Sequence, residues 1–204
     1  MTIEATAKTR ATVPARVAIL AYDGVDELDL FGAYSVLAKA QAAGALNAAG
    51  IYAPYFSVTG SGGAEFRTYP LNCLDRESCM LVVPGGSGSA AAAHSGVLAG
   101  TLRDAYRRGL RIYCCCSGAL IVASALELAN GQLAIHERKR AELQTLFGGE
   151  VVVGLVESNG IISIGGRRSP GVKSVDLAFR LLSDIDPKLP RSISQRTEIE
   201  WPRQ

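Results

Sequence analysis

Short apolar runs alternate with helix-length segments along the first two thirds of this chain, and this alternation limits the possible folds more than any other feature. The runs are rich in β-forming residues and are apolar at consecutive positions, as in strands buried on both faces. The segments between them have the spacing, or the all-round apolar character, of helices packed on a core. The expected strands are 17–22, 55–59, 80–83 and 110–115, and the expected helices are 27–43, 97–108 and 118–128.

Strands that alternate with helices in this way form a mostly parallel sheet covered by helices on both faces, an α/β three-layer sandwich. Beyond Asn130 the sequence predicts a helix over 137–147 and a last amphipathic helix over 171–183. Two strands are expected between these helices, joined by a Ser-Asn-Gly turn typical of hairpins, at 150–156 and 160–164.

We expect one domain, because a chain of this length and composition can bury one sizeable core, and the sequence has no internal repeat. The expected boundaries are a flexible leader over 1–15, a single α/β domain over 16–186 and a C-terminal tail over 187–204. The tail contains several prolines and lacks apolar periodicity, so it is expected to be either a strap over the surface or disordered.

Composition disfavours several classes of function. The chain has 204 residues, of which 48% are hydrophobic and 20% charged, as in a globular protein with one sizeable core. A formal net charge of +2 is too small for a broad phosphate-binding face, so nucleic acid is not an expected partner. No apolar run reaches the roughly 20 residues that span a bilayer, and the leader lacks the apolar centre of a secretory signal. We expect a cytoplasmic protein without a membrane partner; a transit peptide is the less favoured alternative.

The cysteines do not suit a disulfide scaffold or paired zinc knuckles, because their number is odd and three are contiguous. They stand at positions 73, 79, 114, 115 and 116. Reduced thiols in a reducing compartment fit this pattern better. The two histidines and scattered carboxylates offer no metal-ligand spacing. The sequence therefore predicts neither a metal site nor a cofactor.

The strand that ends at Cys115 passes into the helix that starts near Gly118 through a turn that holds Cys116 and Ser117. Such a turn projects a side chain at the carboxyl edge of the sheet, where open α/β proteins bind ligands. Cys116 is then the exposed thiol, and the helix N-terminus favours a thiolate with a lowered pKa. Ser117 can offer its backbone N–H to an oxyanion. Cys114 and Cys115 are expected to point into opposite packed layers as core residues.

Asp29 follows the first strand and stands between the apolar residues Leu28 and Leu30. A carboxyl group in partly apolar surroundings beside a thiolate has a raised pKa, so the two groups can hold one proton between them. An acid catalyst donates such a proton. Two alternatives stay open: Asp29 is an exposed residue of a helix's first turn, or Cys116 is a small buried residue without a chemical role.

Five segments follow one another along the chain: VAILAYDGVDELDLFGAYSVL, LVVPGGSGS, CCCSGAL, LANGQLAIH and SVDLAFRLL. They resemble successive landmarks of the ThiJ/PfpI superfamily, also called the DJ-one-like superfamily. Within it the chain resembles the isonitrile hydratase branch and the amidotransferase-like sensor domain of certain AraC-type regulators. The resemblance implies a flavodoxin-like, class I glutamine amidotransferase-like sandwich, and a homodimer. It also implies that Cys116 is the nucleophile, that Asp29 faces its sulfur, and that Gly86 and Ser117 line an oxyanion site.

The chain departs from this pattern in its histidines. Ser117 stands where the protease-like and glyoxalase-like branches carry a histidine, so no neighbouring imidazole can act as a base. His136 follows the Asn-Gly turn as in relatives, but Glu137 replaces the aromatic residue that often comes next. His94 either reaches the site from the loop after Pro-Gly-Gly or is a solvated loop residue.

The chain is also more basic than the pattern near its last helix. The segment IGGRRSPGVKSVDLAF is longer than the corresponding run of the family. Arg167, Arg168 and Lys173 either add cations near the cleft or face water, and we favour water.

We expect a cysteine-dependent hydratase of the isonitrile hydratase type, acting on a small molecule. The Cys116 sulfur attacks the terminal carbon of an isonitrile to give a thioimidate, Asp29 supplies and recovers a proton, and hydrolysis releases an N-substituted formamide. Backbone N–H groups of Gly86 and Ser117 stabilise the developing charge. One alternative is a non-enzymatic redox-sensing or interaction protein in which Cys116 is oxidised. Another is a glyoxalase or amidase, which the missing histidine disfavours.

Overall fold

The computed structural model describes residues 15–74, 79–166 and 172–201. Within them one central sheet is formed by β1 (Arg16–Leu20), β2 (Ala48–Ala53), β5 (Tyr69–Pro70), β6 (Cys79–Val83), β7 (Ile112–Cys115), β10 (Gly154–Ser158) and β11 (Ile161–Gly165). The order across the sheet is β10-β11-β7-β6-β1-β2-β5, and every neighbouring pair is parallel except β10 with β11. The predicted mostly parallel sheet is confirmed.

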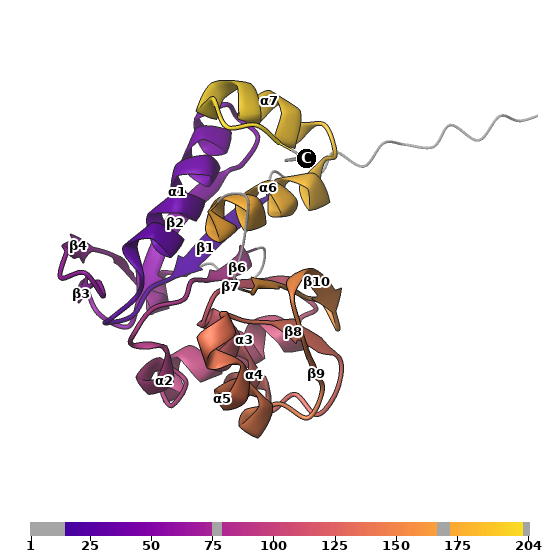
Figure 1. Cartoon of the computed structure of the whole chain (residues 1–204). Helices are drawn as coiled ribbons and strands as arrows, with labels where there is room; N and C mark the ends of the chain where they lie inside the picture. The colour runs from indigo at the N-terminus through magenta and orange to yellow at the C-terminus, as the bar shows by residue number, and fades with distance from the viewer. Residues whose placement is uncertain (1–14, 75–78, 167–171, 202–204) are drawn as a thin grey trace, which may run out of the picture.

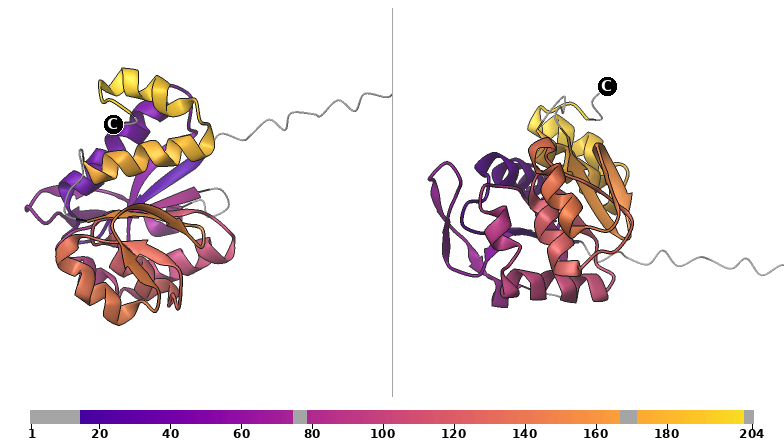
Figure 2. Two further views of the ribbon diagram at one scale, coloured as in Figure 1. Left: turned by 45° about the vertical axis from the view of Figure 1, so that its right-hand side comes forward. Right: turned by 60° about the horizontal axis from the view of Figure 1, so that its bottom comes forward.

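Helices cover both faces of this sheet (Figure 1, Figure 2). One face carries α1 (Glu27–Ala42), α6 (Lys173–Ile185) and α7 (Leu189–Thr197), which pack on one another. The other face carries α2 (Ser89–Ala92), α3 (Gly96–Arg107), α4 (Gly118–Leu126) and α5 (Arg140–Leu146). The fold is thus the predicted α/β three-layer sandwich.

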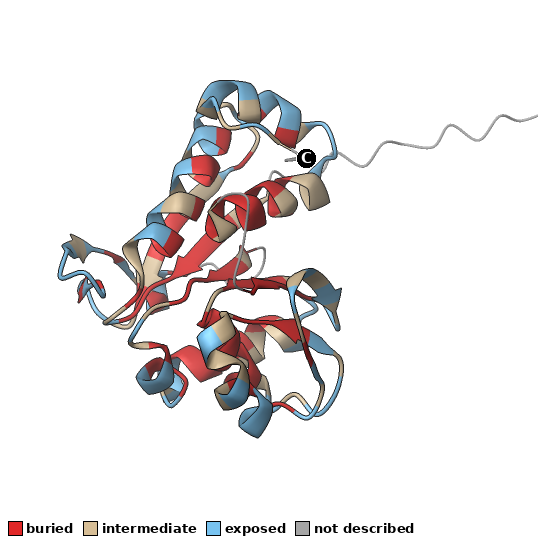
Figure 3. Cartoon of the chain, viewed as in Figure 1, coloured by how far each residue is buried: buried red, intermediate tan, exposed pale blue. Residues whose placement is uncertain are grey.

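The core follows the centre of the sheet and the inward sides of the helices (Figure 3). All four residues of β7 are buried, because β6 and β11 flank the strand and helices cover both of its faces. Cys114 and Cys115 are 0% exposed, as predicted for core residues. The apolar helix α4 is buried on nearly every side, since it contacts the sheet as well as α3 and α5.

The second strand of the central sheet lies outside the segment that the sequence predicts. The prediction was 55–59, but β2 occupies 48–53 and pairs with β1. Its sequence, AAGIYA, is poor in β-forming residues, so the sheet position is set by backbone pairing with β1. Residues 57–59 instead form β3 (Ser57–Thr59), which pairs antiparallel with β4 (Glu65–Arg67) in a separate hairpin.

The predicted strand at 150–156 is divided in two. Its first part is β9 (Glu150–Val152), which pairs with β8 (Gln132–Ala134), and its second part is β10. The turn from β10 to β11 is the expected hairpin, with Asn159 and Gly160 at φ values of 53° and 75°.

The C-terminal segment is a helix, where the sequence predicts a strap or a disordered tail. Residues 189–197 form α7, and Ile193 is 0% exposed against the core. Pro190 lies in the first turn of α7, where a missing N–H breaks no helical hydrogen bond. A proline in the tail is therefore compatible with a helix, because it lies in the first turn.

Two short 3-10 helices, η1 (Leu71–Cys73) and η2 (Glu137–Lys139), complete the elements. Residues 1–14, nearly all of the expected leader, lie outside the described residues. Within the ranges given above, no helix has both the length and the apolar character that a bilayer span requires.

Candidate active site

Three loops meet at the carboxyl edge of the sheet. β1, β6 and β7 are neighbours and run in the same direction, so the segments that follow them emerge together. The loop after β1 leads to Asp29 in the first turn of α1, the loop after β6 contains Gly85 and Gly86, and the turn after β7 holds Cys116 and Ser117. The structure therefore brings together the residues that the sequence singles out.

Cys116 occupies a strained turn between β7 and α4. Its φ is 55°, in the left-handed region that side chains other than glycine disfavour by about 1–3 kcal/mol. The turn is fixed on both sides: the Cys116 N–H donates to the Ile164 carbonyl at 3.1 Å, and the Cys116 carbonyl accepts from the His136 N–H at 3.3 Å. Gly118 lets α4 approach, because a Cβ there would collide with the carbonyls of Val83 and Pro84.

The Cys116 sulfur and the Asp29 carboxyl group are hydrogen-bonded to each other. Asp29 is 8% exposed, and its Oδ2 also accepts from the Gly85 N–H at 3.2 Å. Burial, and next the Asp26 carboxylate, raise the pKa of Asp29. Burial, and next the Asp29 carboxylate, raise the pKa of Cys116 to about 12, against the lowering effect of the Ser117 N–H.

These pKa directions correct the expected thiolate. The sequence predicts that the N-terminus of α4 lowers the pKa of Cys116, but burial beside a carboxylate has the larger effect. The rise at Asp29 is opposed by its hydrogen bond with Cys116, so the two groups do not compete equally for the proton. The thiol keeps the proton and the carboxylate accepts the S–H hydrogen bond. The pair thus holds one proton, on the thiol rather than on Asp29, and Asp29 is positioned to remove it.

The glycine that lies between the two reacting groups is Gly85. A Cβ on Gly85 would lie 2.6 Å from the Cys116 Cβ and 2.8 Å from Asp29 Oδ2, so only glycine fits there. The sequence singles out Gly86 instead. The Gly86 N–H donates to Ser117 Oγ at 2.9 Å, and the Ser117 hydroxyl donates to the Gly86 carbonyl at 3.1 Å. The Gly86 N–H is therefore already engaged, and Pro-Gly-Gly in the sequence does not show which glycine faces the sulfur.

The segment before α1 is fastened to the same loop. The Asp26 N–H donates to the Gly85 carbonyl at 2.8 Å, and Val25 forms a bridge with Gly86. The Tyr22 hydroxyl donates to the Pro84 carbonyl at 2.9 Å, and burial raises the Tyr22 pKa well above its usual value. Tyr22 is a buried neighbour of the site that sequence reasoning assigned only to a strand.

The two histidines differ in their relation to the site. His136 adjoins Cys116 through its backbone, but its ring Nδ1 accepts the Arg138 N–H at 3.2 Å. Burial, and next the Lys173 charge, lower the pKa of His136. His94 is exposed on the loop before α3.

The Lys173 ammonium acts on the site, although the sequence favours water for it. Its charge lowers the pKa of both Asp29 and Cys116. Arg167 and Arg168 lie outside the described residues. The described residues contain no group of three or more His, Cys, Asp and Glu side chains arranged for a metal ion.

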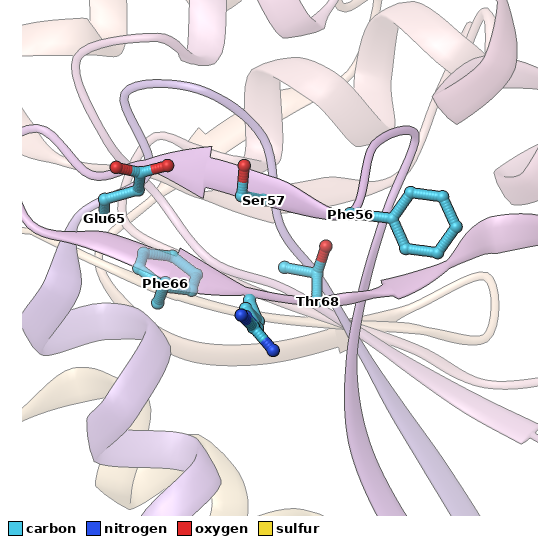
Figure 4. A pocket seen from close by; sticks show the side chains of 6 residues that line it. Phe56, Ser57, Glu65, Phe66 and Thr68 are labelled. Atoms are coloured by element: carbon cyan, nitrogen blue, oxygen red, sulfur yellow. The ribbon is translucent and has the colours of Figure 1, made fainter.

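A hollow of about 630 Å³ lies elsewhere, on the β3–β4 hairpin (Figure 4). Its lining comes from both strands and the residues beside them: Phe56, Ser57, Glu65, Phe66, Arg67 and Thr68. The hollow contains none of the residues that surround Cys116, so we do not assign the chemistry of the thiol to it.

A family model described as the DJ-1/PfpI family matches residues 15–163. The chain belongs to the DJ-1/PfpI family. The resemblance to ThiJ/PfpI proteins that the sequence shows is thus confirmed at the level of the family. No curated protein sequence matches the chain.

Several solved structures have a similar fold. A ThiJ/PfpI family protein from Pseudomonas syringae is 22% identical with a TM-score of 0.78, over 94% of this chain and 77% of that one. DJ-1beta of Drosophila melanogaster is 16% identical with a TM-score of 0.78, over 93% of this chain and 100% of that one. An AraC family transcriptional regulator from Pseudomonas putida is 19% identical with a TM-score of 0.73, over 90% of this chain and 100% of that one. At these identities the likeness concerns the fold.

Proposed function

We propose that this DJ-1/PfpI protein is a cysteine-dependent hydratase that converts an isonitrile into an N-substituted formamide. The supporting observation is the hydrogen-bonded pair of Cys116 and Asp29, with serine rather than histidine at position 117. An isonitrile carbon must be attacked by a nucleophile and must then receive a proton. A thiol whose proton passes to an adjacent carboxylate supplies both.

In the first step the Cys116 sulfur forms a bond to the terminal carbon of the isonitrile while Asp29 takes the thiol proton. Asp29 then delivers this proton to the same carbon, which gives a thioimidate. In the second step water adds across the carbon–nitrogen double bond. The nitrogen gains a proton, the carbon–sulfur bond breaks and the N-substituted formamide leaves, with the remaining proton returned to the pair. The net reaction adds one water to the isonitrile.

We propose that the Ser117 N–H, which interacts with the sulfur, stabilises the charge that develops in these steps. Gly86 was expected to donate a second N–H. In the structure that N–H binds Ser117 Oγ. We therefore propose that Gly86 orients Ser117, and that its N–H reaches the substrate only if Ser117 Oγ turns away.

The test is turnover of an alkyl isonitrile, followed as formamide release. Wild-type protein should produce the formamide, and Cys116→Ala should reduce the rate to the uncatalysed level with an unchanged far-UV circular dichroism spectrum. Cys73→Ala is the matched control, because Cys73 is exposed and lies outside the site. A Cys116→Ala protein with wild-type turnover, or a wild type without turnover, contradicts the proposal.

A second candidate is a redox sensor, which the half-buried position of Cys116 beside Asp29 also supports. An oxidised sulfur carries oxygens that a protonated Asp29 and the Ser117 N–H can bind. Mild peroxide treatment followed by intact-mass and peptide analysis separates the candidates. A discrete oxygen adduct at Cys116, without isonitrile turnover, favours the sensor.

We also propose that the protein is a cytoplasmic homodimer. Large apolar side chains stand exposed near the β3–β4 hairpin, among them Tyr55 at 66% and Phe56 at 76%. A face of this kind is typical of a protein–protein contact. Light scattering coupled to gel filtration should give twice the mass of one chain, and a monomer would contradict the proposal.

A further inference from the structure

Lys173 is the first residue of α6, and the residue after it packs against the start of α1. The Ser174 hydroxyl donates to the Leu28 carbonyl at 3.1 Å. A Cβ on Gly32 would lie only 2.5 Å from Ser174 Oγ, so the two helices touch at this point. Leu28 precedes Asp29 in the chain. Lys173 therefore lies beside the turn of α1 that carries the Asp29 carboxyl group.

The positive charge of Lys173 acts on the Asp29 carboxylate, but the described residues show no ion pair between the two. Lys173 is half-buried, and among the described residues no ion pair joins it to a carboxylate. The first turn of a helix is where the macrodipole disfavours a cation, and the residue before Lys173 offers no capping side chain. The Lys173 ammonium is therefore held at the rim of the site in a position that the helix dipole disfavours.

Further cations lie on the same side. The charges of Lys173, Arg138 and Lys139 all act on His136, against the single acid Glu137. Asp29 is engaged by Cys116 and by the Gly85 N–H. Lys139 also pairs with Glu142 at 2.6 Å. Lys173 and Arg138 are therefore the cations of this rim for which the described residues show no ion pair.

We propose that Lys173 binds a carboxylate on the substrate, so that the site takes isonitriles with an anionic substituent in preference to neutral ones. The chemical identity of the reacting group rests on the function proposed above, whereas the preference for an anion rests on Lys173. Lys173 is then a specificity-determining residue, and the substituent lies between Cys116 and the start of α6.

The experiment measures alkylation of Cys116 by iodoacetate and by iodoacetamide, quantified by peptide mass spectrometry. The two reagents react with the same thiol and differ in charge. Their rate ratio therefore cancels any effect of Lys173 on the reactivity of the sulfur. The ratio of iodoacetate to iodoacetamide should fall about five- to ten-fold in Lys173→Gln and stay within about two-fold of wild type in Lys173→Arg.

Two controls belong to the same samples. Cys73 is exposed and remote from Lys173, so its reagent ratio should not change in either variant. The ratio at Cys116 of the wild type should also decrease with added salt, because screening weakens the attraction of an anion. The salt series needs no variant and keeps the test valid if a variant fails to fold.

An equal fall of both alkylation rates in Lys173→Gln, or no change in their ratio, overturns the proposal, because Lys173 then acts on the thiol alone or not at all. The readout does not depend on turnover. A ratio that depends on Lys173 in a protein that hydrates no isonitrile removes the proposed reaction and keeps the anion site. If the protein hydrates an isonitrile but the reagent ratio at Cys116 does not depend on Lys173, the proposed reaction stands and the anion site is removed.

Discussion

The two ends of α6 lie beside two clusters of charged side chains, and the clusters differ in whether their charges are matched. At the C-terminal end two arginines and two acids form what we call the arginine–carboxylate ring, in which each acid contacts both cations. Its ion pairs are Arg111–Glu157 at 2.5 Å, Arg111–Asp184 at 2.7 Å, Arg180–Glu157 at 2.5 Å and Arg180–Asp184 at 3.0 Å. The Tyr113 hydroxyl also donates to Asp184, at 2.9 Å.

At the N-terminal end of α6 the buried groups are two acids, Cys116 and Asp29, that share one proton. Burial raises the pKa of both, and the only nearby cation of α6, Lys173, lowers both without pairing with either in the described structure. Matched charges hold strands and helix together, whereas unmatched acids keep a proton ready for transfer. We therefore expect the arginine–carboxylate ring to govern stability and the Cys116–Asp29 pair to govern activity.

The largest expected effect is at Cys116. Cys116→Ala and Cys116→Gly should both lose turnover entirely, since the nucleophile is absent. Their stabilities should differ: the glycine variant should be the more stable by about 1 kcal/mol, because only glycine adopts a φ of 55° without strain. Urea unfolding of the two variants measures this difference. Equal midpoints would mean that the turn is not strained.

Asp29→Asn should lower turnover by about 10²- to 10⁴-fold, because the residue that moves the proton is removed. It should also stabilise the protein at neutral pH. The folded-state pKa of Asp29 is raised, so the folded protein binds more protons than the unfolded chain above the ordinary Asp pKa. Stability from this group is full below that pKa and declines as pH rises, and Asn removes the decline. Thermal unfolding between pH 4 and 7 tests this; an unchanged pH dependence contradicts it.

Gly85→Ala should lower turnover by about 10²-fold, because its Cβ meets the Cys116 Cβ and Asp29 Oδ2. Gly100→Ala is the matched control. Gly100 lies within α3 with open space around its Cβ position, so alanine there should leave turnover intact and stabilise the helix by up to about 1 kcal/mol. Equal turnover in the two variants would show that Gly85 does not set the geometry of the pair.

Asp184→Asn should have the smallest effect on activity and a clear effect on stability. It leaves Arg111 and Arg180 with one acid instead of two, at a site where Asp184 is 13% exposed and the arginines are partly exposed. We expect a loss of about 1–2 kcal/mol in urea unfolding with kcat/KM within about two-fold of wild type. A fall in kcat/KM well beyond two-fold would contradict the idea that the arginine–carboxylate ring governs stability and not activity.

The fold was largely predictable because its central strands and helices have strong patterns. The apolar runs that became β1, β6 and β7, and the all-apolar α4, favour strands and a helix that are buried in a central layer. The predictions of secondary structure were wrong where contacts with the rest of the fold, rather than local sequence, determine the conformation. β2 is a strand because β1 pairs with it, and α7 is a helix because Ile193 finds a place in the core.

The sequence predicted which segments come together at the site. It did not predict the protonation state of Cys116. The order of strand, Cys116, Ser117 and Gly118 places the thiol correctly, and the position of Asp29 after β1 brings it to the same edge. The proton's location depends on burial, which sequence does not give, so the expected thiolate was wrong. Which of two adjacent glycines faces the sulfur depends on backbone angles, and the position of Lys173 depends on the packing of α6 on α1.

At this site the Cys116 thiol keeps its proton because it is buried beside the Asp29 carboxylate, which accepts the S–H hydrogen bond. The direct measurement is the pH dependence of Cys116 alkylation by iodoacetamide in wild type and in Asp29→Asn. Burial and Asp29 raise the pKa of Cys116 to about 12 in the wild type, so reactivity should rise only far above neutral pH. In Asp29→Asn the rise should move to lower pH. A wild-type thiol already ionised at neutral pH, or an unchanged profile in the variant, would contradict the claim.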